Sequence, residues 1–209
     1  ELLRRRRHGG AGVIRRPLAF LIAAALAAGM VLSGCSQEGT GDKGFVSGGG
    51  EVREIAAADR GEPISYAGTD LEGQPLAIED FRGMPLVIVV WGAWCAPCRK
   101  EAPEVAELAR SYDGKAAFLG LNIRDVTEVK PQAMARRFDL PYASLFEPEG
   151  RAMLAFRGVL TPKSIPSFVV LDSEGRVASA INGALPSART LGALVDDVIA
   201  EGSPGSGNG

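Results

Sequence analysis

Two cysteines three residues apart, in Trp94-Cys95-Ala96-Pro97-Cys98, constrain this chain more than any other feature. They follow the apolar run 85–91, which predicts a buried strand, and precede residues 99–112, which predict an amphipathic helix. Both thiols are therefore expected at a helix N-terminus, where unpaired N–H groups and the helix dipole favour negative charge.

A thiolate at such a position is stabilised. We therefore expect the pKa of Cys95, placed at the exposed helix cap, to fall below the free cysteine value of about 8.5. Cys95 is then the predicted nucleophile. Cys98, one turn into the helix, is the predicted buried partner that closes the disulfide.

Other uses of a Cys-x-x-Cys pair fit this chain less well. A structural zinc site needs four Cys or His ligands, and the sequence offers only Cys35 and His8 besides the pair. A purely structural disulfide across so short a loop would constrain the unfolded chain little. A c-type haem site needs His after the second cysteine, where Arg99 stands. A redox-active dithiol beside a strand–helix unit is the remaining interpretation.

Composition removes several classes of function. The 23 Lys and Arg residues nearly balance the 25 Asp and Glu residues, so a nucleic-acid partner is not indicated. The single histidine, His8, precedes the body of the chain. A Ser-His-Asp set, a Cys-His pair and a histidine-ligated metal are therefore excluded there, and no cofactor or metal is expected beyond the redox-active disulfide.

The N-terminal region has the pattern of an export signal. Basic residues precede the apolar segment 18–32, which is shorter than a typical membrane span of about 20 residues. The segment ends in Leu32-Ser33-Gly34-Cys35, which resembles the lipobox of bacterial lipoproteins, where the cysteine carries the lipid. We therefore divide the chain into a leader and signal peptide (1–34), a lipidated Cys35 with a flexible tether (35–60), a domain (61–201) and a disordered tail (202–209).

The domain alternates predicted strands and helices. Residues 64–78 predict two short strands around a turn at Glu72-Gly73, and 172–175 predict a second hairpin turn. The other expected elements are an apolar, parallel strand at 115–123, a helix at 128–138, a short helix at 151–156, a strand at 168–171 and a strand at 176–181. A closing helix at 187–200 follows, with Ser187 as a possible cap.

Two further residues attract attention before any comparison. Glu101 falls inside the apolar stripe of the helix after the motif, one turn beyond Cys98. Pro166 lies in Ile165-Pro166-Ser167, directly before a strand, where proline commonly marks an edge or a turn. A cis bond is the functional alternative at Pro166, although only about 5–6% of X–Pro bonds are cis.

Taken together, the strand–CxxC–helix unit, the later Ile-Pro and the final hairpin and helix resemble the thioredoxin superfamily. Within this superfamily, the chain more specifically resembles the TlpA/ResA/CcmG group of membrane-tethered thiol–disulfide oxidoreductases. The resemblance covers about residues 63–201. It implies an α/β, thioredoxin-like fold: a central mixed β-sheet flanked by helices, with an N-terminal β-hairpin and a central αβ insertion.

The resemblance also implies roles for single residues. Pro166 should be cis and lie beside the disulfide, and Glu101 matches the acidic residue that this group places three after the second cysteine. Val89 departs from thioredoxin itself, which has a buried Asp there. Client contacts are implied at the residues flanking the thiols and the proline, which are Trp94, Ala96, Pro97, Ile165 and Ser167.

The function implied is reduction of protein disulfides on the outer face of the cytoplasmic membrane. Apocytochrome c is the implied client, and a membrane electron donor of the CcdA/DsbD kind would return electrons to the protein. Two alternatives stay open. One is a peroxiredoxin-like peroxidase, although those enzymes place Thr three residues before the reactive cysteine, where this chain has Gly92. The other is a metal or haem carrier module, which would lack His and Met near the thiols.

Overall fold

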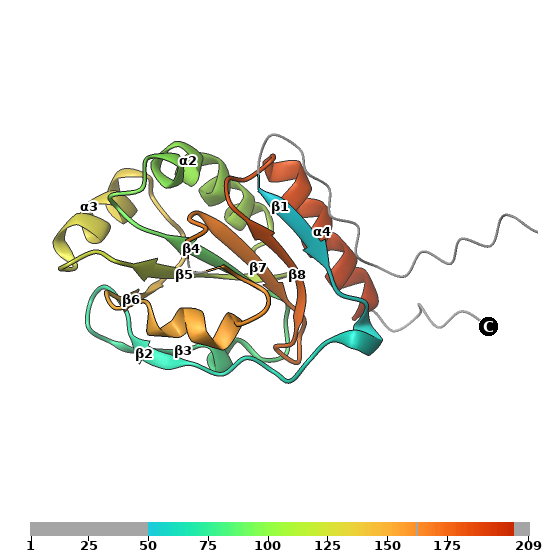
Figure 1. Ribbon diagram of the computed structural model, residues 1–209. Helices are drawn as coiled ribbons and strands as arrows, with labels where there is room; N and C mark the ends of the chain where they lie inside the picture. Colours follow the sequence, from blue (N-terminus) through green and yellow to red (C-terminus); the bar gives the residue numbers. More distant parts are fainter. Residues whose placement is uncertain (1–49, 162, 203–209) are drawn as a thin grey trace, which may run out of the picture. The chain divides into compact units, whose positions relative to one another are not determined.

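The computed structural model describes residues 50–161 and 163–202, so the leader, Cys35, the tether up to residue 49 and the last seven residues lie outside the described part. A six-stranded sheet runs in the order β1-β8-β7-β4-β5-β6 (Figure 1). The pairs β4–β5 and β5–β6 are parallel, whereas β7 is antiparallel to β4 and β8, and β1 is antiparallel to β8. The sheet is therefore mixed, as the expected fold class requires.

The elements follow the predicted order closely. The sheet strands are β1 (Glu51–Glu54), β4 (Leu86–Trp91), β5 (Ala117–Ile123), β6 (Ser144–Glu147), β7 (Ser167–Leu171) and β8 (Val177–Asn182). A separate hairpin pairs β2 (Ala67–Thr69) with β3 (Pro75–Ala77). The helices are α2 (Ala96–Ser111), α3 (Val129–Arg137) and α4 (Ala188–Glu201), with 3-10 turns η1 (Ala57–Asp59), η2 (Ile78–Phe81) and η3 (Arg151–Phe156).

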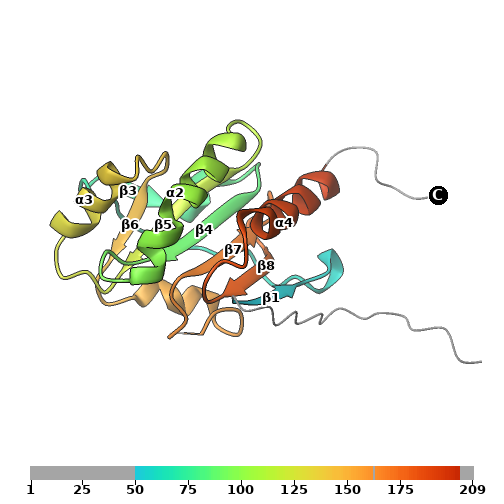
Figure 2. The same ribbon diagram turned by 90° about the horizontal axis from the view of Figure 1, so that it is seen from above.

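Strand β4 is the centre of the core because both faces of the sheet are covered around it. All six of its residues are buried, which explains its uninterrupted apolar sequence. Val87, Val89 and Trp91 face the side covered by α2, α3 and α4, and the alternate residues face the side covered by η2 and η3. Figure 2 shows α2 and α4 lying along the same face of the sheet. The apolar stripe predicted for α2 is confirmed, since Ala102, Val105 and Ala109 are buried.

The predicted boundary between tether and domain needs correction. The segment expected to be tether up to residue 60 already contains β1 and η1, so the folded domain begins before residue 61. Val52 is the only buried residue of β1, and charged neighbours hide the strand pattern. The short helix predicted at 151–156 is confirmed, and it is of the 3-10 type. The cap prediction for α4 is confirmed, because the backbone N–H of Thr190 donates to Ser187 Oγ at 3.1 Å.

Arg60 fastens this early segment to the end of the sheet opposite the cysteines. Its side chain is 4% exposed, and Nη1 lies 3.2 Å from Asp172 Oδ2 while Nη2 lies 2.7 Å from Glu201 Oε2. Burial pushes the pKa of Asp172 up. The backbone N–H and guanidinium of Arg176 and the guanidinium of Arg60 outweigh that effect and hold the pKa below its usual range.

We therefore expect Arg60→Met to lower the free energy of unfolding by about 1.5–3 kcal/mol, the range for losing a hydrogen bond to a charged group, because Asp172 stays buried with Arg176 as its remaining charged partner. A carboxyl whose pKa is lowered by folding adds stability above its unfolded pKa and loses it as the pH falls through the folded value. The loss in Arg60→Met should therefore be largest near pH 7 and shrink below about pH 3.9. Urea unfolding near pH 7 and below about pH 3.9 measures this loss of stability. The exposed Arg189→Met is the control. Equal values for wild type and Arg60→Met would contradict the role of Arg60.

Candidate active site

The two cysteines lie where β4 ends and α2 begins. Cys95 is the N-cap of α2, and its Sγ accepts a hydrogen bond from the Cys98 backbone N–H at 3.2 Å. Its own N–H donates to Gly92 O at 3.1 Å, which closes the turn that leaves the strand. Pro97 stands in the first turn of α2, where its missing N–H costs no helical hydrogen bond. The backbone therefore presents both sulfur atoms at a helix N-terminus, as predicted.

Cys95 and Cys98 are joined in a disulfide, with Cα atoms 5.3 Å apart. The predicted contrast between an exposed and a buried cysteine is wrong for this oxidised state, because Cys95 is 3% exposed and Cys98 is 5% exposed. The Cys95 sulfur is turned toward the helix rather than toward solvent. It forms the disulfide with Cys98 Sγ and accepts a hydrogen bond from the Cys98 backbone N–H. The choice of Cys95 as nucleophile therefore stays a prediction.

Pro166 lies beside this pair. The Ile165–Pro166 bond is cis, as the resemblance implied, and Pro166 lines the same cavity as Cys98. Its carbonyl accepts from the Gly183 backbone N–H at 3.1 Å. Ile165 is half-buried next to it. Ser167, expected to contact clients, is instead fully buried, and its hydroxyl donates to Ser164 O at 2.8 Å, so the structure does not bring this side chain to the surface.

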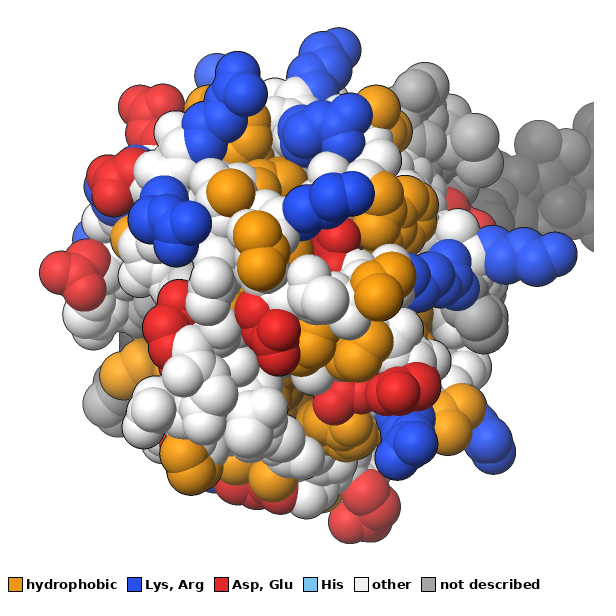
Figure 3. All heavy atoms as spheres, turned by 90° about the vertical axis from the view of Figure 1, so that its left-hand side faces the viewer, with side chains coloured by type: hydrophobic (Ala, Val, Ile, Leu, Met, Phe, Trp, Pro, Cys, Tyr) orange, Lys and Arg blue, Asp and Glu red, His pale blue; other side chains and the backbone are white. Residues whose placement is uncertain are grey.

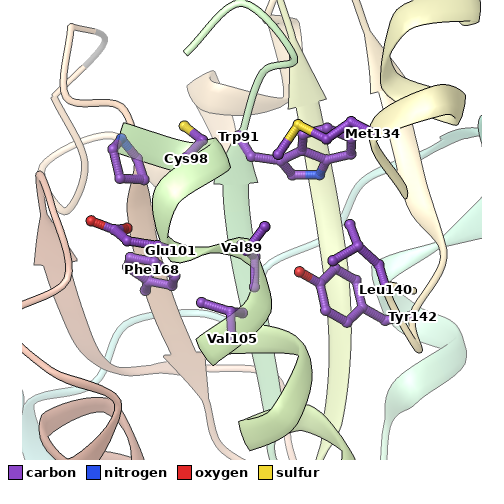
Figure 4. Close-up of a pocket in the computed structure, with 11 residues that line it drawn as sticks. Val89, Trp91, Cys98, Glu101, Val105, Met134, Leu140, Tyr142 and Phe168 are labelled. Carbon is purple, nitrogen blue, oxygen red and sulfur yellow. The ribbon is translucent and has the colours of Figure 1, made fainter. Parts of the chain in front are cut away.

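A small, mostly apolar cavity lies against Cys98, one half of the disulfide (Figure 4). Its volume is about 20 Å³, which is space for roughly one water molecule. Cys98 and Glu101 reach it from α2, and Val89 and Trp91 reach it from β4 (Figure 4). Val89 is buried, and the carboxylate that lines this cavity belongs to Glu101.

The two carboxylate oxygens of Glu101 differ in their hydrogen bonding. Its Oε1 accepts from the Leu185 backbone N–H at 3.1 Å, whereas its buried Oε2 has no hydrogen-bond partner among the described residues. Burial raises the pKa of Glu101 above its ordinary value, and the bond from Leu185 opposes this only in part. The expectation that Glu101 turns toward the core rather than solvent therefore fits the structure, while its effect on the thiols stays a prediction.

The turn before the cysteines is braced by a polar cluster that the sequence analysis missed. Asp125 is 4% exposed, and its Oδ2 accepts from the Ala93 backbone N–H at 2.7 Å and from Asn122 Nδ2 at 2.9 Å. Trp94 Nε1 donates to Ile123 O at 3.1 Å, while the residue as a whole is 46% exposed. The available signal was the position of Asn122 and Asp125 at the carboxyl end of a buried parallel strand, beside the end of β4.

Position 92 bears on the peroxidase alternative. A Cβ added to Gly92 would lie 2.5 Å from Trp94 Nε1 and 3.1 Å from Ile123 O. A threonine three residues before Cys95 would therefore require Trp94 to leave its place.

The described residues bring together no group of three or more His, Cys, Asp or Glu side chains that could hold a metal ion.

Comparison with known proteins fits this geometry. Residues 61–180 match the AhpC/TSA family. The chain belongs to this family. Over 122 residues it is 29% identical to the thiol-disulfide oxidoreductase ResA of Bacillus thuringiensis subsp. konkukian, covering 58% of this chain and 68% of the relative. It is 24% identical over 125 residues to the thioredoxin-like protein YneN of Bacillus subtilis, covering 59% of this chain and 71% of that one.

Solved structures show the same fold. A DsbF homologue from Corynebacterium diphtheriae aligns with a TM-score of 0.66 at 25% identity, over 75% of this chain and 99% of that one. A secreted thiol-disulfide isomerase from Corynebacterium glutamicum aligns with a TM-score of 0.68 at 24% identity, over 77% and 99% of the two chains. The thioredoxin-like fold, the similarity to the ResA group and the class of thiol–disulfide oxidoreductase acting through Cys95 and Cys98 are thereby confirmed.

Proposed function

We propose that this protein is a reductase of disulfides in client proteins. The observation that carries the proposal is the Cys95–Cys98 disulfide at the N-terminus of α2, flanked by exposed Trp94, Ala96 and Pro97. In the reduced protein the Cys95 thiolate attacks one sulfur of a client disulfide, forming a mixed disulfide and releasing one client thiolate. The Cys98 thiolate then attacks Cys95 Sγ and releases the second client thiolate. Two electrons pass to the client and the Cys95–Cys98 disulfide re-forms.

The surface around the motif suits a polypeptide client. In the described part of the chain, five large hydrophobic side chains are exposed. Three of them follow the carboxyl ends of β4 and β5: Trp94, Val126 and Val129. Figure 3 looks onto the side of the molecule where α3 lies. Hydrophobic side chains form patches there, and Lys, Arg, Asp and Glu side chains lie around and between them. Such a mixed surface favours contacts with a folded or extended protein over a small apolar ligand.

The reduction of a purified protein disulfide tests the proposal directly. Insulin is the probe, because precipitation of its freed B chain follows cleavage of its disulfides. Wild-type protein supplied with dithiothreitol should accelerate precipitation, whereas Cys95→Ser should match the uncatalysed background. Rapid consumption of hydrogen peroxide by the wild type with no gain in insulin reduction would overturn the proposal in favour of the peroxidase.

We infer that the protein acts outside the cytoplasm, anchored to the membrane by lipid on Cys35. The support is the sequence Leu32-Ser33-Gly34-Cys35 at the end of a short apolar segment, which lies outside the described residues. None of the helices in residues 50–161 and 163–202 is long and apolar enough to cross a membrane. A membrane thiol donor of the CcdA/DsbD kind would keep Cys95 and Cys98 reduced, and apocytochrome c is the proposed client.

The anchor makes a separate prediction. We expect Cys35→Ala to block lipid attachment, so that the variant either appears in the soluble extracytoplasmic fraction or accumulates unprocessed. Cell fractionation with immunoblotting measures both outcomes, and metabolic labelling with a fatty acid reports the modification. Cys95→Ala is the matched control, since it removes a cysteine and should leave fractionation unchanged. A Cys35→Ala protein that stays membrane-bound at its mature size would contradict lipid anchoring.

A further inference from the structure

The short segment Gly158–Thr161 leads from η3 toward Ile165–Pro166, the edge beside the disulfide. The segment belongs to no helix or strand. Local turns hold part of it, because the N–H groups of Val159 and Leu160 donate to Phe156 O. Three more of its backbone groups, Gly158 O, Val159 O and Thr161 N–H, are bonded by side chains from two strands that are distant in sequence. The carbonyl of Thr161 accepts from the nearby Ser164 backbone N–H at 3.1 Å. The position of this segment is therefore set in part by side chains from outside it.

Asn182, the last residue of β8, makes two of these bonds. Its Nδ2 donates to Val159 O at 2.8 Å, and its Oδ1 accepts from the Thr161 N–H at 3.0 Å. The carboxamide thus spans the segment with one donor and one acceptor, a combination that neither aspartate nor an apolar side chain supplies. The Asn182 backbone is itself fixed between two strands, opposite Ser167 of β7 and Glu51 of β1.

Arg53 supplies a second, independent anchor from β1. Its Nη1 donates to Gly158 O at 2.7 Å, one residue before the carbonyl that Asn182 holds. The residue after Asn182 secures the far side of the same edge, because Gly183 N–H donates to Pro166 O at 3.1 Å. The end of β8 therefore contacts the chain both before and at the proline.

We propose that Asn182, assisted by Arg53, is a positioning residue that fixes the Ile165–Pro166 edge against which a client polypeptide docks. This inference rests on the proposed reduction of protein disulfides. Asn182 does not line the cavity beneath Cys98, and the turn that carries the cysteines is held separately by Gly92 and Asp125. Loss of the Asn182 carboxamide should consequently impair docking of a polypeptide while leaving the chemistry of the thiols intact.

The test compares a protein disulfide with a small one. Steady-state reduction of insulin and of an aromatic small-molecule disulfide is measured for wild type, Asn182→Ala, Asn182→Asp and Arg53→Ala. We expect KM for insulin to rise about fivefold in Asn182→Ala, the order expected for the loss of one to two net hydrogen bonds. Asn182→Asp should show at least the same rise, because its carboxylate would face Val159 O, and Arg53→Ala a smaller one. In all three variants kcat, and the rate with the small disulfide, should stay within about twofold of wild type.

Ser179→Ala is the matched control in the same strand, since the buried Ser179 hydroxyl has no hydrogen-bond partner among the described residues. It should leave both KM values unchanged. An unchanged KM for insulin in both Asn182 variants would overturn the inference, as would an equal loss of activity toward both substrates. A wild-type protein that reduces neither disulfide would refute the proposed function itself, which is a distinguishable result.

Discussion

Cys98→Ser is expected to convert the protein from a catalyst into a covalent trap. Cys95 would still attack a client disulfide, but a serine hydroxyl cannot displace sulfur, so the mixed disulfide would persist. With reduced protein and insulin in a single turnover, the first client thiol should still be released, whereas release of the second should fall by about a hundredfold or more. A covalent complex sensitive to reductant should appear on a non-reducing gel, approaching one equivalent per protein.

The matched variant Cys95→Ser decides which sulfur attacks. Burial does not distinguish the two, since Cys95 and Cys98 are both almost fully buried in the disulfide. The position of Cys95 at the helix cap favours it, because its thiolate would face the unpaired N–H groups of the first turn. Complexes formed by Cys95→Ser and absent from Cys98→Ser would reverse the assignment.

The same trap identifies clients in cells. Thiol alkylation at lysis preserves the Cys98→Ser complexes, and mass spectrometry of the captured proteins names their partners. Apocytochromes among them would support the proposed role in cytochrome maturation. Their absence from a list of other captured proteins would contradict that role and leave the oxidoreductase activity standing.

The sequence predicted those parts of the molecule whose structure depends on local pattern. Strand β4 is apolar throughout because both of its faces are covered, and α2 carries an apolar stripe because only one of its faces is. The motif between them fixes the strand–turn–helix order, and the cysteines were therefore correctly predicted at the N-terminus of α2. The role of Pro166 came from resemblance rather than from any property of residues 165–167.

The parts that were missed depend on contacts between residues far apart in the chain. Strand β1 has one buried residue, Val52, so its alternation is too short to be visible, and its partner β8 lies about 130 residues away. Arg60 meets Asp172 across 112 residues, and Asn182 reaches Val159 only once β8 is paired. The burial of Cys95 was missed for another reason, since the disulfide turns its sulfur away from solvent.

Glu101→Gln is expected to change how the protein responds to pH. A carboxyl whose pKa is raised by folding contributes its full stability below its unfolded pKa, about 4.3, and loses it as the pH rises through the folded value. Glutamine removes that loss and can keep the bond from Leu185 N–H. The variant should therefore be more stable than wild type at pH 7, and this advantage should disappear at low pH.

The same substitution should affect the dithiol. Glu101 is one turn beyond Cys98 and lines the same cavity, so its negative charge opposes formation of a neighbouring thiolate. Without that charge, the thiolates should form at lower pH and reduction of clients should reach its plateau earlier. Absorbance titration of the reduced thiols and the pH dependence of insulin reduction, between about pH 6 and 9, measure these shifts.

Glu104→Gln is the matched control for this charge change. It removes one carboxylate from the same helix, but Glu104 is exposed, bonds Ala188 N–H at 2.9 Å and does not line the cavity. A shift in thiol titration confined to Glu101→Gln would therefore assign the effect to the cavity rather than to the net charge of α2. If both variants titrate like wild type and reduce insulin equally across this pH range, Glu101 does not tune the thiols, and its buried, half-satisfied carboxylate serves only the packing of α2 against residues 184–186.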